Sequence, residues 1–317
     1  MKRIPRWTLP LAVLALGFAS PSAGSPLADP AFGAYWHDGK AELDGYRMTI
    51  SRYDAPRQGH AVLIYVTEPF SRSKHVKVDD PAKAPADVVD VLKLNLVRDF
   101  QTGIYDYNTM VSLFSASETF APIKVSFSST EWCGNIYQEL NFFPTRVEDR
   151  VDSYFEGESA TRTLALPAGG VIEDNLFILL RGLRGDYLQP GEKRTVPFLS
   201  SPFHSRLAHR PLAWISATIE RSRGTSQVRV PAGVFATSLY TVRVSDGREG
   251  TFSVERAYPH RIVRWAWSPG TGAPGKTFLG GSHQGELSGT SRVQYWKLHN
   301  PGDETALRPL GLAPLAP

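Results

Sequence analysis

The sequence predicts a mainly β fold, a large antiparallel curved sheet or half-barrel with one or two helices. Three observations predict it. Apolar residues alternate with polar ones along many segments, a tight-turn dipeptide separates two of these segments, and a single stretch has a helical pattern.

The alternating segments have the period of two residues that is typical of strands with one buried face. Their apolar positions are Tyr46, Met48 and Ile50; Leu92, Leu94 and Leu96; Ile123, Val125 and Phe127; Ile215, Ala217 and Ile219; Tyr240, Val242 and Val244; and Val263, Trp265 and Trp267. The run 61–66 is continuously apolar, which predicts a strand that is covered on both faces. Asp246-Gly247 supplies the positive φ angles of a tight hairpin, so antiparallel pairing follows.

The helical stretch is 173–182, with acids in its first turn and Gly182 as its end. Proline and glycine residues in 185–202 indicate a connection or a weak domain boundary. We therefore expect four parts: a signal peptide, an N-terminal β-rich region, a C-terminal β region and a poorly ordered tail. Their respective bounds are 1–25, 26–185, 186–300 and 301–317.

The N-terminus predicts export. Lys2, Arg3 and Arg6 precede an apolar run over 9–18, which is too short to span a bilayer, and small residues at 22–25 then offer a cleavage site. We expect a periplasmic or secreted protein, with a membrane anchor as the alternative. The only Cys is Cys133, far from the cleavage site, so a lipoprotein is not predicted.

Charge and cysteine content exclude two classes. Of 35 Lys and Arg residues, three belong to the leader, which leaves 32 against 31 Asp and Glu. A mature chain so close to neutrality, with no basic cluster, does not predict a nucleic-acid partner. A single Cys also excludes an intramolecular disulfide framework.

Two motif matches fail on their context. Gly270–Thr277 fits the phosphate-loop pattern, but Pro274 removes a backbone donor and the glycines that follow would end a helix at once. We therefore expect a flexible hairpin connection, with no nucleotide and no cofactor. Ser71 and Lys74 have the S-x-x-K spacing without its companion motifs, which indicates an exposed loop.

The metal and nucleophile candidates also have a simpler interpretation. The eight His include no H-E-x-x-H motif, so His204 and His209 are interpreted as scattered surface residues and no metal site is predicted. No cation lies near Cys133 in the sequence, and a free Cys is among the most buried residue types, so we expect a packed core thiol. The alternative is a hydrolase in which Cys133 is the nucleophile and His37 or His60 a distant base.

Aromatic residues are the remaining functional candidates. Along strands they usually form the core, but on the inner face of an incompletely closed sheet they can line a groove for an apolar ligand. The candidate ligand-binding residues are Tyr35, Trp36, Tyr105, Tyr107, Trp132, Trp265, Trp267, Tyr295 and Trp296.

Several segments carry a resemblance to known sequences. The stretches 34–43, 60–70, 102–107 and 128–134 resemble a family of uncharacterised secreted bacterial proteins, some labelled septum formation inhibitor Maf, although the Maf motif S-x-S-P-R-R is absent here. The C-terminal half resembles the domain of unknown function DUF3108 through 188–192 and 228–235. The resemblance implies an envelope protein with a half-barrel sheet, like lipoprotein carriers, and no catalytic residues.

The leading hypothesis is therefore a non-enzymatic exported protein that binds an apolar ligand, a lipid or lipoprotein, or an envelope partner on its curved sheet. The Cys133 hydrolase is one alternative. The other is a structural scaffold without a small ligand, which would have a solidly packed inner face.

Overall fold

A computed structural model describes residues 30–269 and 282–314. Within these ranges, 16 strands form one sheet that is not closed. The strand order is β10-β11-β12-β13-β14-β15-β16-β1-β2-β4-β5-β6-β7-β8-β9, with β3 paired to β2. All neighbours are antiparallel except β10 and β11, so the structure confirms the predicted fold class.

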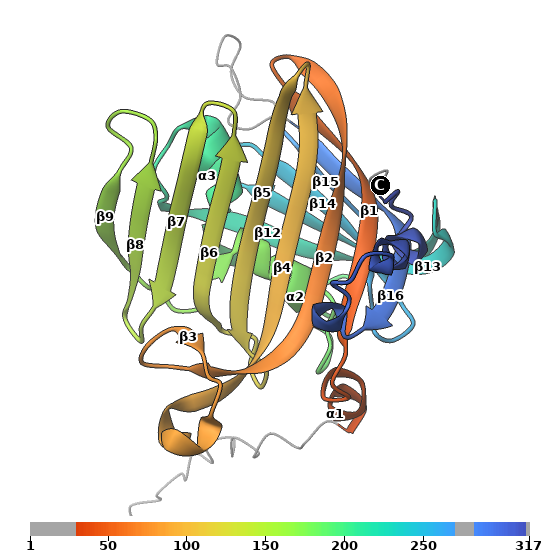
Figure 1. Ribbon diagram of the computed structural model, residues 1–317, viewed down its shortest axis with the longest axis horizontal. Helices are drawn as coiled ribbons and strands as arrows, with labels where there is room; N and C mark the ends of the chain where they lie inside the picture. The colour runs from red at the N-terminus through yellow and green to blue at the C-terminus, as the bar shows by residue number, and fades with distance from the viewer. Residues whose placement is uncertain (1–29, 270–281, 315–317) are drawn as a thin grey trace, which may run out of the picture.

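The sheet curves into two walls. The first wall contains β1 (Ala41–Arg52), β2 (Ala55–Ser71), β3 (Val76–Lys77), β4 (Val88–Thr102), β5 (Tyr105–Ala116), β6 (Pro122–Glu131), β7 (Gly134–Phe142), β8 (Arg146–Ser153) and β9 (Ala160–Ala165). The second contains β10 (Val171–Ile172), β11 (Lys193–Leu199), β12 (Trp214–Val230), β13 (Gly233–Val244), β14 (Glu249–Glu255), β15 (Ile262–Ser268) and β16 (His283–Val293). The walls join where β1 pairs with β16, so both expected β regions contribute to one sheet (Figure 1).

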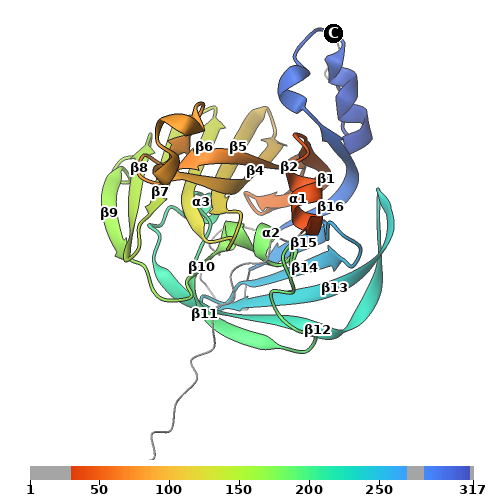
Figure 2. The same ribbon diagram turned by 90° about the horizontal axis from the view of Figure 1, so that it is seen from below.

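Short helices complete the fold. They are α1 (Pro30–Trp36), α2 (Leu176–Leu179) and α3 (Pro202–Ala208), with 3-10 helices η1 (Pro81–Lys83), η2 (Pro85–Asp87), η3 (Glu173–Asn175), η4 (Tyr295–Lys297) and η5 (Asp303–Leu310). Figure 2 shows the two walls curving around α2 and α3. The predicted helix over 173–182 is present but shorter: η3 and α2 together end at Leu179, and Gly182 follows at φ +60°.

The inner face is filled by packed side chains. The alternating residues Tyr46, Met48 and Ile50 are buried there, as the period of two predicts. Leu176, Phe177 and Ile178 from α2 fill the space between the walls. A continuous apolar core therefore occupies the concave side of the sheet.

The predicted tight turn is confirmed. Asp246-Gly247 lies within the tight turn that joins β13 to β14, and Gly247 has φ +94°. Val230 ends β12 and Gly233 begins β13, so this segment is a strand, a turn and a second strand.

The tail differs from the expected disorder. Asp303–Leu310 forms η5, and Leu310 is buried against β1 and β16. The reason is a pair of glycines, Gly45 and Gly289, that face each other in register; a Cβ on either would collide with the main chain at 309–310. Ser288 Oγ also donates a hydrogen bond to Leu310 O at 2.7 Å.

The same tail explains the apolar run 61–66. Ala61, Leu63 and Tyr65 face the inner core, while Val62 and Ile64 face outward and lie beneath the C-terminal segment. This strand therefore has apolar contacts on both faces, as predicted.

Two expectations lie outside the described residues, the signal peptide over 1–25 and the phosphate-loop match at 270–277. In the described part of the chain, every helix is too short or too polar to cross a membrane.

Candidate functional site

The aromatic candidates fall into three groups by solvent exposure and do not converge on one site. Those with almost no solvent exposure are Trp36, Tyr107, Trp265 and Trp267, those partly buried are Tyr35, Tyr105 and Tyr295, and those exposed are Trp132 and Trp296. The first group belongs to the core, where the Trp265 ring packs edge-on against Tyr46 at 4.6 Å. The exposed group lies on turns and on the C-terminal segment.

The prediction for Cys133 is wrong, because the thiol is exposed. Cys133 lies in the two-residue turn between β6 and β7, where a side chain projects into solvent, and its backbone N–H donates to Tyr105 Oη at 2.9 Å. The proposed distant bases have carboxylate partners of their own: His37 lies 3.0 Å from Asp90 and His60 lies 3.1 Å from Asp99.

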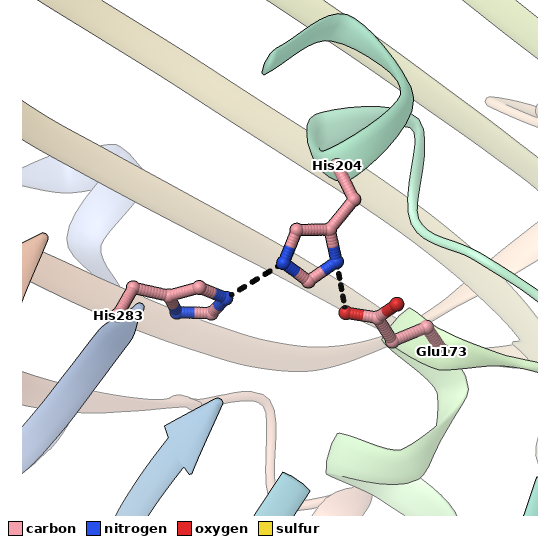
Figure 3. Close-up of side chains that lie close together, drawn as sticks. All are labelled: Glu173, His204 and His283. Atoms are coloured by element: carbon pink, nitrogen blue, oxygen red, sulfur yellow. Dashed lines mark hydrogen bonds and ion pairs between the residues drawn. The ribbon is translucent and has the colours of Figure 1, made fainter. Parts of the chain in front are cut away.

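A buried polar cluster, which sequence reasoning missed, lies between the walls (Figure 3). It joins Glu173 of η3, His204 of α3 and His283, the first residue of β16. Glu173 Oε1 lies 2.6 Å from His204 Nδ1, and His204 Nε2 lies 3.2 Å from His283 Nε2. Arg248, from the β13–β14 turn, donates to Glu173 Oε2 at 2.9 Å. The cluster thus ties both inner helical segments to the second wall.

The hydrogen bonds define one direction along the cluster. Trp265 Nε1 can only donate, and it lies 3.4 Å from His283 Nδ1, which must therefore accept. A neutral His283 then carries its proton on Nε2 and donates to His204 Nε2. A neutral His204 that accepts at Nε2 carries its proton on Nδ1, which then donates to Glu173 Oε1 but also faces the donor Arg248 Nη1 at 2.7 Å. In this arrangement the one lone pair of each neutral ring is used, because His283 Nδ1 accepts from Trp265 and His204 Nε2 accepts from His283.

The electrostatics favour a neutral His283 and an ionised Glu173. Burial, then the neighbouring His204 and the charge of Arg98, hold the pKa of His283 well below its usual range. Burial alone would raise the pKa of Glu173, but His204 and Arg248 outweigh it and leave that pKa below the ordinary value. Two guanidinium groups close by and no free lone pair on either ring disfavour a metal ion, although the three side chains are near enough to share one.

The expectation that His204 is a surface residue is therefore wrong, while His209 is exposed and pairs with Glu158 at 2.6 Å. Local capping explains the difference. Ser201 caps α3 by accepting from the Phe203 N–H at 3.1 Å, which directs His204 inward, and the helix ends at His209 with φ +51°.

A second feature is an apolar groove of 560 Å³ on the outer face of the sheet, which we call the outer groove. Its floor is formed by β1, β2, β4 and the end of β16, and its other side by the C-terminal segment. The apolar lining residues are Leu43, Val62, Ile64, Val97, Val293, Tyr295, Leu298, Pro301, Ala306, Leu307 and Leu310. In Figure 2 the dark-blue C-terminal segment lies on the outer side of the curved sheet, next to β1 and β16.

The polar residues of the outer groove are His299, Asn300, Asp303 and Glu304, all from the C-terminal segment. The floor contributes apolar side chains alone: Val62 and Val97 are register partners on neighbouring strands, as are Leu43 and Ile64. The groove therefore has an apolar floor and a partly polar, acidic cover. Tyr295 is the one aromatic candidate from the sequence that lines it.

Comparison with known proteins identifies no family. No family model matches the chain, and no curated protein matches it. Among solved structures, the chain is similar to a beta-barrel-like protein of domain of unknown function DUF1849 from Brucella abortus, with 9% sequence identity and a TM-score of 0.46, over 80% of this chain and 97% of that one.

Proposed function

We propose that this protein is an exported, non-enzymatic envelope protein that binds an apolar, chain-like ligand, such as the acyl chain of a lipid, in the outer groove. The observation that carries the proposal is the groove itself. It is a 560 Å³ hollow with apolar side chains on both sides, made by a sheet face and a segment that packs on it.

The groove has the properties of a small-molecule site. Its volume falls in the range of about 300–1,000 Å³ that ligand pockets occupy, and such pockets combine a mainly apolar lining with a few polar groups. Val62, Ile64 and Val97 present branched apolar surface to the ligand. Because Asp303 and Glu304 are the acidic groups of the cover, the polar end of the ligand is expected to be uncharged or cationic.

A larger hollow of 700 Å³ lies at the open ends of the sheet, but it fits an apolar chain less well. Its lining includes Leu166 and Val196, together with the polar side chains of Asn175, Arg194 and Thr195. Burying an uncompensated polar group against hydrocarbon costs free energy, so a purely apolar chain is better matched by the outer groove.

A structural scaffold is the second candidate. The filled concave face favours it, because the core and the Glu173 cluster leave the aromatic inner face packed rather than open. The two functions differ in one observable property: a scaffold would not bind an apolar ligand in the outer groove.

The test is a fluorescence titration with N-phenyl-1-naphthylamine, a neutral apolar fluorophore. We expect saturable binding to the wild type and at least tenfold weaker binding to the Ile64→Asn/Val97→Asn variant. Leu166→Asn, in the other hollow, and Val234→Asn, on an exposed position of β13, are the matched controls and should bind as the wild type does. Equal binding by all variants, or no binding by a folded wild type, would exclude the outer groove as the site.

A further inference from the structure

One end of the first wall carries a row of exposed hydrophobic side chains, one on each hairpin turn. The turns are Tyr53-Asp54 between β1 and β2, Gly103-Ile104 between β4 and β5, Trp132-Cys133 between β6 and β7, and 154–159 between β8 and β9. Antiparallel order places all four at the same end of the sheet, the upper end in Figure 1. We call Tyr53, Ile104, Trp132 and Tyr154 the aromatic rim.

These four are the most exposed large hydrophobic residues of the described chain. Their exposed fractions are 61% for Tyr53, 76% for Ile104, 63% for Trp132 and 63% for Tyr154. Tyr53 also adopts φ +54°, a conformation that favours Asn or Gly over a bulky residue. Large apolar groups at every tip, one of them in an unfavourable backbone conformation, indicate a surface that contacts another phase or partner.

A second layer of tyrosines holds the rim in place. Tyr107 Oη lies 2.9 Å from Tyr53 Oη, and the Tyr105 ring lies 5.2 Å from that of Tyr107 and 6.2 Å from that of Trp132. At the other end of the row, the Tyr154 ring packs onto Gly134, where a Cβ would collide with it. The rim side chains are therefore supported from below while their outer parts remain in solvent.

We propose that the aromatic rim docks the protein on the interface of a lipid bilayer. Neighbouring tips are two strands apart, about 10 Å, so the row extends over about 30 Å. A protein partner needs a contiguous, close-packed patch of about 800 Å². Separate side chains on a curved row can instead each enter fluid lipid, and Trp and Tyr are the residues that prefer the bilayer interface.

The charges near the rim indicate which membrane surface it fits. Arg52 stacks over Tyr53 at 4.6 Å, but Asp54 follows directly and Asp106 lies at the neighbouring turn. The rim thus has no excess of basic residues that would select anionic lipids. Docking is driven by the transfer of the rim side chains from water into the bilayer interface. It therefore depends little on ionic strength and does not require anionic lipid.

The experiment is co-sedimentation of the exported protein, purified after removal of its leader, with vesicles of dioleoylphosphatidylcholine. We expect the wild type to sediment with vesicles at low and high salt. The variant Tyr53→Ser/Ile104→Ser/Trp132→Ser/Tyr154→Ser should lose at least tenfold in vesicle affinity. The matched control replaces four exposed hydrophobic residues elsewhere, Val76→Ser/Met110→Ser/Val234→Ser/Leu239→Ser, and should sediment as the wild type does.

A second measurement does not need the fourfold variant. With brominated phosphatidylcholine, part of the tryptophan fluorescence of the wild type should be quenched, and Trp132→Phe should abolish that part. A wild type that stays in the supernatant, or quenching that persists in Trp132→Phe, would overturn the proposal. So would concentration-dependent dimers that the rim variant loses, because they would make the rim an interface between copies of the chain. The rim variant should keep its affinity for N-phenyl-1-naphthylamine, which separates this surface from the outer groove.

Discussion

Gly45 of β1 pairs in register with Gly289 of β16, and the main chain of the C-terminal segment passes directly over this glycine pair. The outer face is flat at this point because neither residue has a Cβ. The close approach positions Leu310 in the sheet surface and leaves the outer groove open beside it. The groove therefore depends on two glycines that are far apart in the sequence.

Replacing Gly289 by Val should detach η5. The new side chain would collide with Pro309 O, and overpacking of this kind costs about 1–3 kcal/mol. Amide hydrogen exchange over 303–310 should become faster, and binding of the apolar fluorophore should weaken. Gly224→Ala is the matched control, since a Cβ there meets no atom within 4 Å. Unchanged exchange in Gly289→Val would show that the glycine pair does not position the segment.

The buried ion pair between Arg181 and Glu42 should dominate the stability of the interior. The two groups lie 2.7 Å apart with both side chains fully buried, and Arg181 also donates to Pro259 O at 2.8 Å. Arg181→Met would leave Glu42 buried without a counter-ion, so we expect a loss of about 3–5 kcal/mol in the free energy of unfolding. Denaturant titration measures this loss.

Two variants accompany that measurement. The double variant Glu42→Gln/Arg181→Met should recover part of the loss, because it removes the uncompensated charge as well. Arg146→Met breaks a solvent-exposed pair with Glu148 and should change stability by less than about 1 kcal/mol. If Arg181→Met and Arg146→Met lower the free energy of unfolding by similar amounts, the buried ion pair contributes no more to stability than the exposed one.

Stability should depend on pH through Asp174. Burial, and then the neighbouring charge of Glu173, raise the pKa of Asp174 to about 7. The folded protein then binds the Asp174 proton more tightly than the unfolded chain does, so this group lowers stability as pH rises from about 4 to 7. Asp174→Asn removes the titration, and its stability relative to the wild type should be greater at pH 8 than at pH 5.

Thermal unfolding of both proteins at the two pH values measures this difference. The Asn side chain can still accept the hydrogen bond that Ser201 Oγ donates to Asp174 Oδ1 at 2.8 Å, so the variant tests charge rather than capping. A stability difference that is the same at pH 5 and pH 8 would contradict the raised pKa.

The exposed Cys133 gives a direct chemical prediction. A thiol on the β6–β7 turn should react completely with a maleimide in the folded protein, without denaturant. Mass spectrometry should show one added label at the rate of a free thiol. Labelling that requires unfolding would instead support the packed thiol that the sequence predicts.

The sequence predicts local structure well and distant packing poorly. The alternation at Tyr46, Met48 and Ile50 predicts a strand because burial on one face of a sheet has a period of two. The Asp246-Gly247 turn is predicted for an equally local reason, the φ angles that its residues favour.

The errors concern contacts between residues that are far apart in the chain. His204 and His283 are 79 positions apart, and no spacing rule connects them with Glu173. The tail from 301 has no periodicity, and its order depends on Gly45 and Gly289 in other strands. The sequence predicts a core position for Cys133 because free Cys is often buried, whereas its place on a two-residue turn decides its exposure.

Native mass spectrometry of protein purified from its own envelope tests the central claim most directly, because it detects the ligand that the outer groove holds. The wild type should carry a lipid-sized mass that organic extraction releases, and Ile64→Asn/Val97→Asn, purified in the same way, should lack it. A folded wild type without such a mass, or the same mass on both proteins, would contradict the assignment of the outer groove as a binding site for an apolar chain.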